Sequence, residues 1–262
     1  MKSNLEIAIK ASIEAGKEIL KIYNTNFSVE VKNDASPLTL ADKNANDVIN
    51  SYLEKTGIPI ISEENKQINY SERKNWRTCW IVDPLDGTKE FVKRNGEFTV
   101  NIALIESGKP KLGVIYVPVT KELYFATEGL SKACKITISE NESFKFITEY
   151  SKELQPAYNA KPIRIVGSRS HLNDATKEYI SEIEKHNDVE IVSKGSSLKF
   201  CLVAEGNAHV YPRFAPTMEW DTAAGQAICE AVGVSVIDQN TEQPLCYNKE
   251  NLLNPHFLVK VS

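Results

Sequence analysis

Features that mark several protein classes are scarce in this sequence of 262 residues. The charges nearly cancel, with 31 Lys and Arg against 35 Asp and Glu, so no field of one sign exists to hold a polyanion. No run of Lys and Arg is interleaved with aromatic residues, as in many nucleic-acid-binding surfaces. We therefore expect no nucleic-acid polymer as partner, whereas a small phosphorylated ligand remains compatible with the composition.

Cysteine is also scarce and its spacing is uninformative for a metal or a disulfide. The five cysteines are odd in number and form no C-x-x-C pair, which argues against a disulfide framework and a structural zinc site. The first 20 residues carry Glu6, Lys10 and Glu14 within their apolar stretch, unlike a signal peptide or a transmembrane segment. We expect a cytoplasmic protein, either free or peripherally associated with the inner membrane.

Hydrophobic periodicity predicts the elements of the first part of the chain. Apolar and small residues recur at helical spacing over 5–23 and 41–53, with the polar segment 32–42 as a connector between them. Short apolar runs at 58–62 and 79–84 predict buried strands. From residue 98 to residue 139, β-rich runs separated by turn residues predict several more strands.

A polar segment at 141–161 predicts a boundary, and the pattern changes beyond it. Strands and helices then alternate as far as residue 238, which is typical of an α/β unit. We expect an α/β (α+β) fold made of two tightly packed halves, residues 1–155 and 156–262, that can also be counted as one domain. An ordinary apolar fraction of 42% is enough to bury a sizeable core and excludes a disordered chain.

The strongest chemical signal is the segment WIVDPLDGTKEF at residues 80–91. A buried strand delivers Asp83 at its end, Pro84 interrupts it, and Asp86 follows after a tight turn. Two carboxylates with a carbonyl between them form the kind of hard-oxygen site that suits Mg²⁺. Gly87 and Thr88 then offer backbone N–H groups to a phosphate. The alternative is an ordinary turn, which Pro, Asp and Gly also favour.

Other acids lie at the ends of predicted elements, and each has a structural alternative. Glu63 and Glu64 follow a strand and can equally be a solvated pair. Asp221 precedes a helix rich in small residues and can be its N-cap, and Asp42 fits a capping box with Thr39. Four acids at element ends of one chain can nevertheless build a two-metal site.

These motifs resemble the inositol monophosphatase-like, magnesium-dependent and lithium-sensitive phosphatases over nearly the whole chain. Within that family the sequence is most similar to the 3′(2′),5′-bisphosphate nucleotidases of the CysQ type, because Lys89 and Glu90 follow DPLDGT. The segments that carry the resemblance are SPLTLAD (36–42), SEE (62–64), residues 80–106, VGSRSH (166–171), GSSLKFC (195–201), YPRFAPTMEWD (211–221) and EWDTAAGQAICEAVG (219–233). The resemblance implies a layered αβαβα sandwich.

The resemblance also assigns roles to single residues. A first Mg²⁺ would be held by Glu63, Asp83 and the Leu85 carbonyl, and a second by Asp83, Asp86 and Asp221. Asp42 and Thr88 would orient and deprotonate the attacking water, with Asp42 near a third metal, so two or three ions are expected. Substrate contacts would come from Gly87, Thr88, Ser168, Arg169, His171, Gly195, Lys199, Arg213 and Asp221.

The activity implied is hydrolysis of the 3′-phosphate of 3′-phosphoadenosine 5′-phosphate to AMP and phosphate, in sulfur assimilation. The sulfated precursor nucleotide is a second expected substrate, and the chain would work as a monomer or homodimer. Two alternatives stay open: an inositol or sugar monophosphatase with the same metals, and a non-catalytic nucleotide- or metal-binding protein. The role of Lys89 is also open, because its side chain can face either Glu90 or a ligand.

Overall fold

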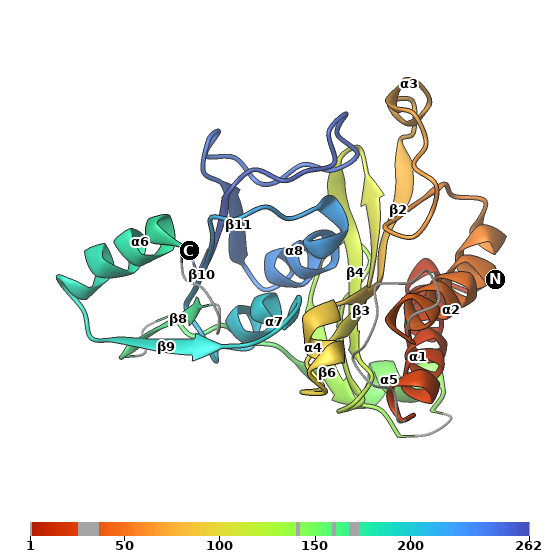
Figure 1. Ribbon diagram of the computed structural model, residues 1–262, viewed down its shortest axis with the longest axis horizontal. Coiled ribbons are helices and arrows are strands. Elements are labelled where there is room, and N and C mark those ends of the chain that lie inside the picture. Colours follow the sequence, from red (N-terminus) through yellow and green to blue (C-terminus); the bar gives the residue numbers. More distant parts are fainter. Residues whose placement is uncertain (1, 26–36, 140–141, 159–160, 168–172, 262) are drawn as a thin grey trace.

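The computed structural model describes residues 2–25, 37–139, 142–158, 161–167 and 173–261. Two β-sheets alternate with three layers of helices, so that the expected αβαβα order is confirmed (Figure 1). The helices and short 3₁₀ turns are α1 (Asn4–Tyr23), α2 (Pro37–Leu53), η1 (Glu54–Thr56), α3 (Tyr70–Arg73), α4 (Thr88–Val92), α5 (Phe144–Tyr150), α6 (Asp174–Glu184), α7 (Leu198–Ala204), η2 (Glu219–Asp221) and α8 (Ala223–Glu230).

The first sheet has seven strands in their chain order. Strands β1 and β2 are parallel, and every later neighbouring pair is antiparallel. Its strands are β1 (Ile60–Ser62), β2 (Thr78–Asp86), β3 (Thr99–Glu106), β4 (Lys109–Val117), β5 (Glu122–Ala126), β6 (Ala133–Thr137) and β7 (Lys152–Glu153). The predicted strands at 58–62, 79–84 and 98–139 are thus confirmed, with shifted ends.

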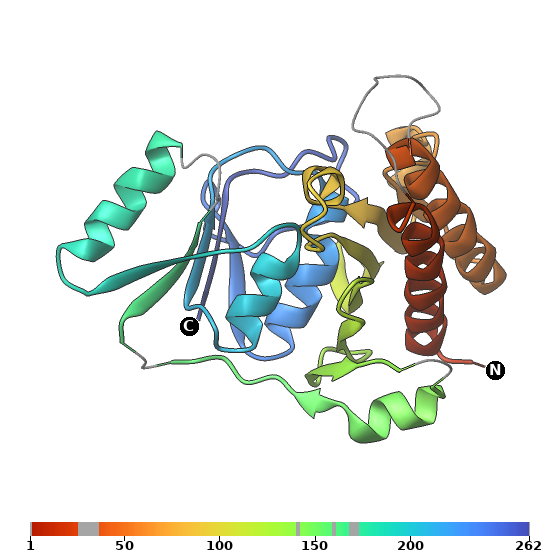
Figure 2. The same ribbon diagram turned by 60° about the horizontal axis from the view of Figure 1, so that its bottom comes forward.

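Both faces of this sheet are covered, which explains why its strands are almost continuously apolar. Helices α1 and α2 pack together on one face of the sheet (Figure 2). The side chains of Val100, Ile102 and Leu104 belong to the hydrophobic core between these helices and the sheet. The alternate side chains Ala103 and Ile105 point to the opposite face, toward α7 and α8. A strand of period two therefore serves two hydrophobic cores.

The predicted connector at 32–42 is wrong for residues 37–42, and residues 32–36 lie outside the described residues. Helix α2 occupies Pro37–Leu53, so Asp42 lies in the second turn and cannot cap the start. Proline is tolerated in the first turn because the N–H that it lacks has no intrahelical partner there. The capping-box alternative for Asp42 is excluded by this position.

The second sheet has the order β11-β12-β10-β8-β9 and lies beyond the two central helices, with α6 on its far side (Figures 1 and 2). Its strands are β8 (Ile163–Gly167), β9 (Val189–Ser193), β10 (Val210–Arg213), β11 (Val234–Asp238) and β12 (Phe257–Val261). The predicted alternation of strands and helices in this region is confirmed.

The polar segment at 141–161 contains more structure than the boundary that the sequence predicts. Helix α5 is capped by Ser143, whose hydroxyl accepts a hydrogen bond from the Phe146 N–H at 3.2 Å. Strand β7 then pairs with β6 and ends the first sheet. Among the described residues, no helix is long and apolar enough to cross a membrane. Oligomeric state and cellular location stay predictions.

Candidate active site

An irregularity in β2 brings two acids to the same face of the first sheet. Asp83 pairs with Asn101 of β3, and Asp86 pairs with Thr99, so three steps along β2 match two steps along β3. The extra residue forms a bulge, without which positions 83 and 86 would face opposite sides. The Leu85 N–H donates to Asp83 Oδ1 at 3.0 Å and fixes the bulge. Strand β2 therefore continues past Pro84, where the sequence predicts its end.

A third acid, Asp221, comes close to Asp83 and Asp86 from the C-terminal half of the chain. Asp221 ends the 3₁₀ turn η2, and its Oδ2 accepts a hydrogen bond from the Met218 N–H at 2.7 Å. The N-cap position of α8 belongs to Thr222, so the N-cap alternative for Asp221 is wrong. Carboxylate oxygens of Asp83, Asp86 and Asp221 lie within 4.8 Å of one another. The fold thus brings together three of the predicted metal ligands.

Glu63 and Asp42 lie beside this cluster on neighbouring elements. Glu63 follows β1, and its N–H donates to the Val82 carbonyl at 3.2 Å, directly before Asp83. A side-chain network steadies that loop, because Ser62 Oγ donates to Asn46 Oδ1 at 2.8 Å and Asn46 Nδ2 donates to Asn65 Oδ1 at 2.8 Å. Helix α2 therefore positions both Asp42 and the end of β1.

The acids raise each other's pKa values. Burial, followed by the charges of Asp86, Glu63 and Asp221, raises the pKa of Asp83 well above its usual range. Burial and the charge of Asp86 raise the pKa of Asp221 to about 7. Burial and then Glu64 and Glu63 raise the pKa of Asp42 to about 8. Burial and the charges of Glu64 and Asp86 raise the pKa of Glu63, and a hydrogen bond with Asp83 partly offsets that rise.

A cation would relieve this repulsion, and the donor set fits a hard one. Buried carboxylates that stay ionised need a positive partner or a metal. The donors are carboxylate oxygens, which suit Mg²⁺, Ca²⁺ and Mn²⁺ more than soft metals. Leu85, whose carbonyl is the remaining expected ligand, is buried within the bulge between Asp83 and Asp86.

The turn after Asp86 is held close to the C-terminal half. Gly87 has a φ of 97°, and a Cβ there would lie 3.1 Å from the Ser196 Cβ, so the position requires glycine. Thr88 is the exposed first residue of α4. The N–H groups at this start have no partner within the helix and can face an anion.

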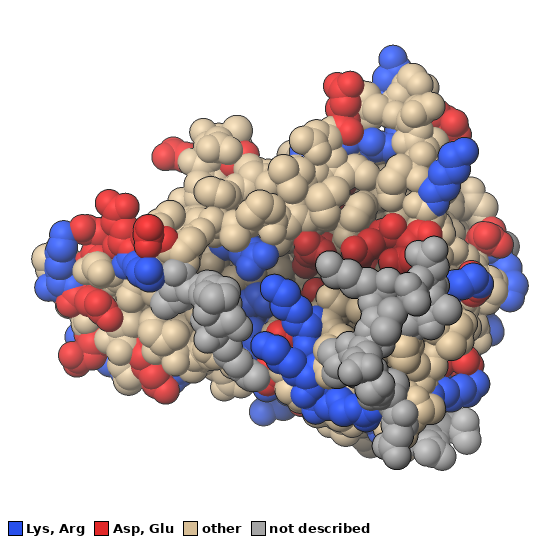
Figure 3. Space-filling model, viewed as in Figure 1, with Lys and Arg blue, Asp and Glu red and all other residues tan. Residues whose placement is uncertain are grey.

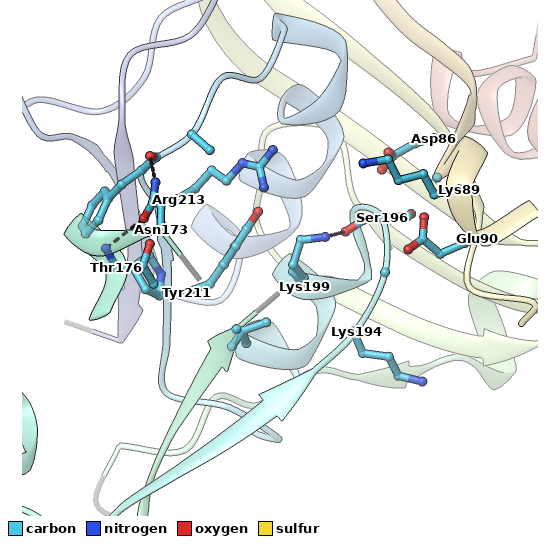
Figure 4. Close-up of a pocket in the computed structure, with 17 residues that line it drawn as sticks. Asp86, Lys89, Glu90, Asn173, Thr176, Lys194, Ser196, Lys199, Tyr211 and Arg213 are labelled. Carbon is cyan, nitrogen blue, oxygen red and sulfur yellow. Dashed lines mark hydrogen bonds between the residues drawn. The ribbon is translucent and has the colours of Figure 1, made fainter. Parts of the chain in front are cut away.

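A cavity of about 420 Å³ opens beside the acids, and its charged lining residues are mostly basic: Lys89, Lys194, Lys199 and Arg213 against Asp86 and Glu90. Asp86, Ser196, Lys199, Tyr211 and Arg213 line both this cavity and a smaller one of about 100 Å³ that reaches Asp221. Lys199, Tyr211 and Arg213 face the part of the cavity toward Asp86 (Figure 4). Acidic and basic side chains accordingly meet in the middle of this face of the molecule (Figure 3).

Two cations in this cavity keep donors available. Lys199 Nζ donates to the Ser196 carbonyl at 2.6 Å and lies 5.7 Å from the centre of the Tyr211 ring. Burial, and secondarily Arg213, lowers the pKa of Lys199, while Asp86 opposes that change. Arg213 Nη2 donates to the Pro216 carbonyl at 3.1 Å, whereas its buried Nε finds no partner among the described residues.

Some of the other residues that line the cavity were predicted from the sequence, and others were not. Gly195 is buried, its N–H donates to Glu97 Oε2 at 2.8 Å, and a Cβ there would lie 2.5 Å from Glu90 Cγ. Lys89 and Glu90 both line the cavity, so the position of Lys89, which the sequence left open, is at this cavity. The sequence analysis missed Lys194, Tyr211 and Phe214 as lining residues, although Lys194 directly precedes GSSLKFC (195–201) and the other two lie within YPRFAPTMEWD (211–221). The predicted contacts Ser168, Arg169 and His171 lie outside the described residues.

Asn173 was also missed as a lining residue. Its Oδ1 accepts from the Thr176 N–H at 2.9 Å and caps α6, while its Nδ2 donates to the Phe214 carbonyl. The asparagine thereby joins α6 to the segment that follows β10. An Asn immediately before an amphipathic run was the available signal for such a cap.

Comparisons with known proteins identify relatives that match nearly the whole chain. A family model described as the inositol monophosphatase family matches residues 1–259. The 3′(2′),5′-bisphosphate nucleotidase CysQ of Salmonella typhimurium is 44% identical over 98% of this chain and 99% of its own. The same-named protein of Escherichia coli K12 is 45% identical over 94% of this chain and 95% of its own.

Solved structures show the same relation. The crystal structure of CysQ from Bacteroides thetaiotaomicron superposes with a TM-score of 0.93 and 52% identity, covering 100% of this chain and 98% of that one. An inositol monophosphatase from Zymomonas mobilis has a TM-score of 0.76 at 20% identity, covering 100% of this chain and 95% of that one, and shares the fold. The chain belongs to the inositol monophosphatase family.

Proposed function

We propose that this chain is a magnesium-dependent 3′(2′),5′-bisphosphate nucleotidase that hydrolyses 3′-phosphoadenosine 5′-phosphate to AMP and phosphate. Relatives with that printed name are about 45% identical over nearly the full length. The observation that carries the proposal is the direct continuity between a carboxylate cluster and a cavity lined by Lys199 and Arg213. A ligand with two separated phosphates matches both parts.

Glu63, Asp83 and Leu85 are proposed to hold one Mg²⁺, and Asp83, Asp86 and Asp221 a second. Bound divalent ions lower the pKa of water and stabilise charge on the entering and leaving oxygens of a phosphoryl group. The chain supplies the fixed arrangement of carboxylates, which the β2 bulge and η2 set before any substrate binds. We place a third ion, if one binds, beside Asp42.

Asp42 is proposed to accept the proton of the attacking water, with the Thr88 hydroxyl orienting that water. In the metal-free protein burial and the charges of Glu64 and Glu63 raise the pKa of the half-buried Asp42 to about 8, which makes its carboxylate a stronger base than an exposed aspartate. A cation held by Glu63 would oppose that rise and keep the carboxylate ionised. The Gly87 and Thr88 N–H groups stabilise the phosphoryl oxygens. These roles need no covalent nucleophile.

Lys199 and Arg213 are proposed to bind the phosphate that stays on the product. Arg213 has an unpartnered buried Nε among the described residues, and the guanidinium fork suits a phosphate. Tyr211 and Phe214 offer aromatic surface in the same cavity for the base. Gly195, Ser168, Arg169 and His171 complete the proposed contacts. The sulfated precursor nucleotide would fit the same groups.

A paired substrate assay tests the proposal. Phosphate release from 3′-phosphoadenosine 5′-phosphate and from inositol 1-phosphate is measured side by side, with Mg²⁺ and with a chelator. Metal-dependent release that is faster from the nucleotide is expected. Faster release from inositol 1-phosphate would favour a monophosphatase with the same metals. Metal binding without release from either ester would favour a non-catalytic binding protein.

A further inference from the structure

A small buried polar network lies directly behind Asp86. It consists of Thr99 and Asn101 on β3 and of Ser196 and Ser197 at the start of α7, all of them buried. Thr99 and Asn101 stand opposite Asp86 and Asp83 in the strand register, on the face that carries Ala103 and Ile105 further along. Polar residues here interrupt an otherwise apolar face, so their contacts need an explanation.

The hydrogen bonds fix which way the Asn101 amide points. Its Oδ1 receives the Thr99 hydroxyl at 3.0 Å and the Ser197 hydroxyl at 2.8 Å. Thr99 Oγ1 lies 2.6 Å from Ser196 Oγ, which can supply the proton that Thr99 accepts in turn. The two hydroxyls can donate or accept, so the carboxylate on the other side of the amide decides its orientation: a flip would turn Oδ1 toward Asp86, which offers no donor when ionised. Oδ1 therefore faces the hydroxyls.

With that orientation, the amide NH₂ faces the cluster of acids. Asn101 Nδ2 donates to Asp86 Oδ2, with the two atoms 3.4 Å apart. The donor is neutral, so it directs one oxygen of Asp86 without cancelling the charge that a metal needs. Hydrogen bonds to a ligating carboxylate commonly set its orientation and its affinity for the ion.

We propose that Asn101 is a positioning residue for Asp86, and that Ser197 holds the Asn101 amide in this orientation. The proposal rests on the proposed function, in which Asp86 is a metal ligand. The hydrogen-bond network links the two halves of the chain, because Asn101 belongs to the first sheet and Ser197 is the N-cap of the helix that carries Lys199 into the cavity. The metal affinity of the site then depends on how α7 packs against β3.

The test measures metal affinity rather than activity. Mn²⁺ replaces Mg²⁺, because the same carboxylates bind both, and free Mn²⁺ is followed by electron paramagnetic resonance. Asn101→Leu keeps a similar shape but removes the donor, and a rise of about tenfold in the Mn²⁺ dissociation constant is expected. Ser197→Ala keeps the amide but frees its orientation, so a smaller rise is expected.

Gln226→Leu is the matched control. Gln226 is a buried amide on α8 that donates to the Leu245 carbonyl at 3.1 Å and accepts from the Tyr247 hydroxyl at 2.7 Å. Its loss is expected to lower stability and leave Mn²⁺ affinity unchanged. Equal affinity in wild type and Asn101→Leu, or an equal loss in Gln226→Leu, overturns the proposal.

Two further outcomes are separated by the same titration. If Asn101→Leu does not fold, as judged by circular dichroism, Ser197→Ala decides: unchanged affinity in that variant overturns the role of the network. If wild-type protein binds no Mn²⁺, the metal-dependent function itself is wrong. Wild-type binding with unaffected variants therefore refutes the positioning role alone.

Discussion

Asp83 combines near-complete burial with several neighbouring negative charges. It is 1% exposed, and the charges of Asp86 and Glu63 oppose its ionisation. Without a cation such an arrangement costs stability, because a buried like-charge group is not compensated. The side chain is therefore placed for binding rather than for holding the fold together.

Asp83→Asn is expected to separate stability from function. In chelator the variant should melt at a higher temperature than wild type, because Asn cannot ionise and so avoids the free-energy cost of burying an acid beside Asp86 and Glu63, while Asn Oδ1 can still accept from the Leu85 N–H. Mg²⁺ should raise the melting temperature of wild type only, since a ligand stabilises the state that binds it. Turnover should be lost. Scanning calorimetry with and without Mg²⁺ measures this, and a destabilised but active variant would contradict it.

Asp42 gives the metal-free protein a pH dependence of defined sign. Its pKa rises from 3.8 in the unfolded chain to about 8 in the folded one, so the folded state binds the extra proton between these values. Stability is therefore lost as pH rises toward 8. Asp42→Asn should flatten that fall. Urea unfolding in chelator between pH 5 and pH 8 tests this; parallel curves for the two proteins would refute it.

Lys199 is expected to discriminate between substrates. Lys199→Ala should weaken binding of the bisphosphate by at least about tenfold, since a charge-assisted hydrogen bond contributes roughly 1.5–3 kcal/mol, and should affect adenosine 3′-monophosphate, which lacks the retained 5′-phosphate, much less. Lys111→Ala, which removes a surface cation paired with Glu106, is the control. Calorimetric titration of adenosine 3′-monophosphate and of the bisphosphate into metal-free protein compares the two losses. Equal losses would remove Lys199 from the proposed role.

Single residues differed in how well the sequence revealed them. Asp83 and Asp86 could be predicted because a dense local motif surrounds them, and Asp221 because it stands at an element end. Asn101 could not, since its partner Ser197 is 96 positions away and its side depends on the strand register. Nothing local distinguishes it from any polar residue in a strand.

At the scale of elements, close approach of α8 to the first sheet sets the position of Asp221. A Cβ on Gly113 of β4 would lie 2.6 Å from the Ala224 carbonyl oxygen and 2.7 Å from the Ala227 Cβ. A Cβ on Gly225 would lie 2.4 Å from the Phe200 ring of α7. Helix α8 is thus wedged between β4 and α7, directly after the turn that ends in Asp221.

Gly113→Ala is expected to push α8 away from the sheet. Overpacking of this kind costs about 1–3 kcal/mol of unfolding free energy, and Mg²⁺ affinity should fall as Asp221 moves with its helix. Urea denaturation and metal titration measure both effects. Gly57→Ala is the control: its φ is 70° but no atom lies within 4 Å of a Cβ there, so it should cost stability without altering metal affinity. Unchanged Mg²⁺ affinity in Gly113→Ala would show that the packing of α8 against β4 does not set the position of Asp221.

Most elements could be predicted because each has a clear apolar period, and their ends could not. The bulge in β2 is the instructive case, since Pro84 argues for the end of a strand, yet the ladder resumes at Asp86 and Thr99. Helix α5 was missed because it has seven residues and buries Ile147 while it exposes Phe146 and Tyr150, so its apolar residues do not form one buried face. Cross-strand pairing decided the bulge, whereas the Ser143 cap and the packing of Ile147 decided the helix.

At the scale of the whole molecule, the halves at 1–155 and 156–262 share one of the two hydrophobic cores. Ile81 and Ala103 from the first half pack in the same cluster as Ala224 and Val259 from the second. A hydrogen bond from the Gly195 N–H to the Glu97 carboxylate also links the two halves. We propose that neither half is stable alone, because each would expose the face that the other covers.

Unfolding is therefore expected to be cooperative across both sheets. Hydrogen exchange followed by mass spectrometry in increasing urea should show peptides from β2–β4 and from β10–β12 losing protection at one concentration, as in a single cooperative unit. Saturating Mg²⁺ should move both midpoints upward together, because the proposed ligands Asp83 and Asp86 come from one half and Asp221 from the other. Chelator provides the unshifted reference. Separate midpoints for the two sheets, or a Mg²⁺ shift confined to the first sheet, would show that the halves fold independently and that Asp221 does not join the metal site.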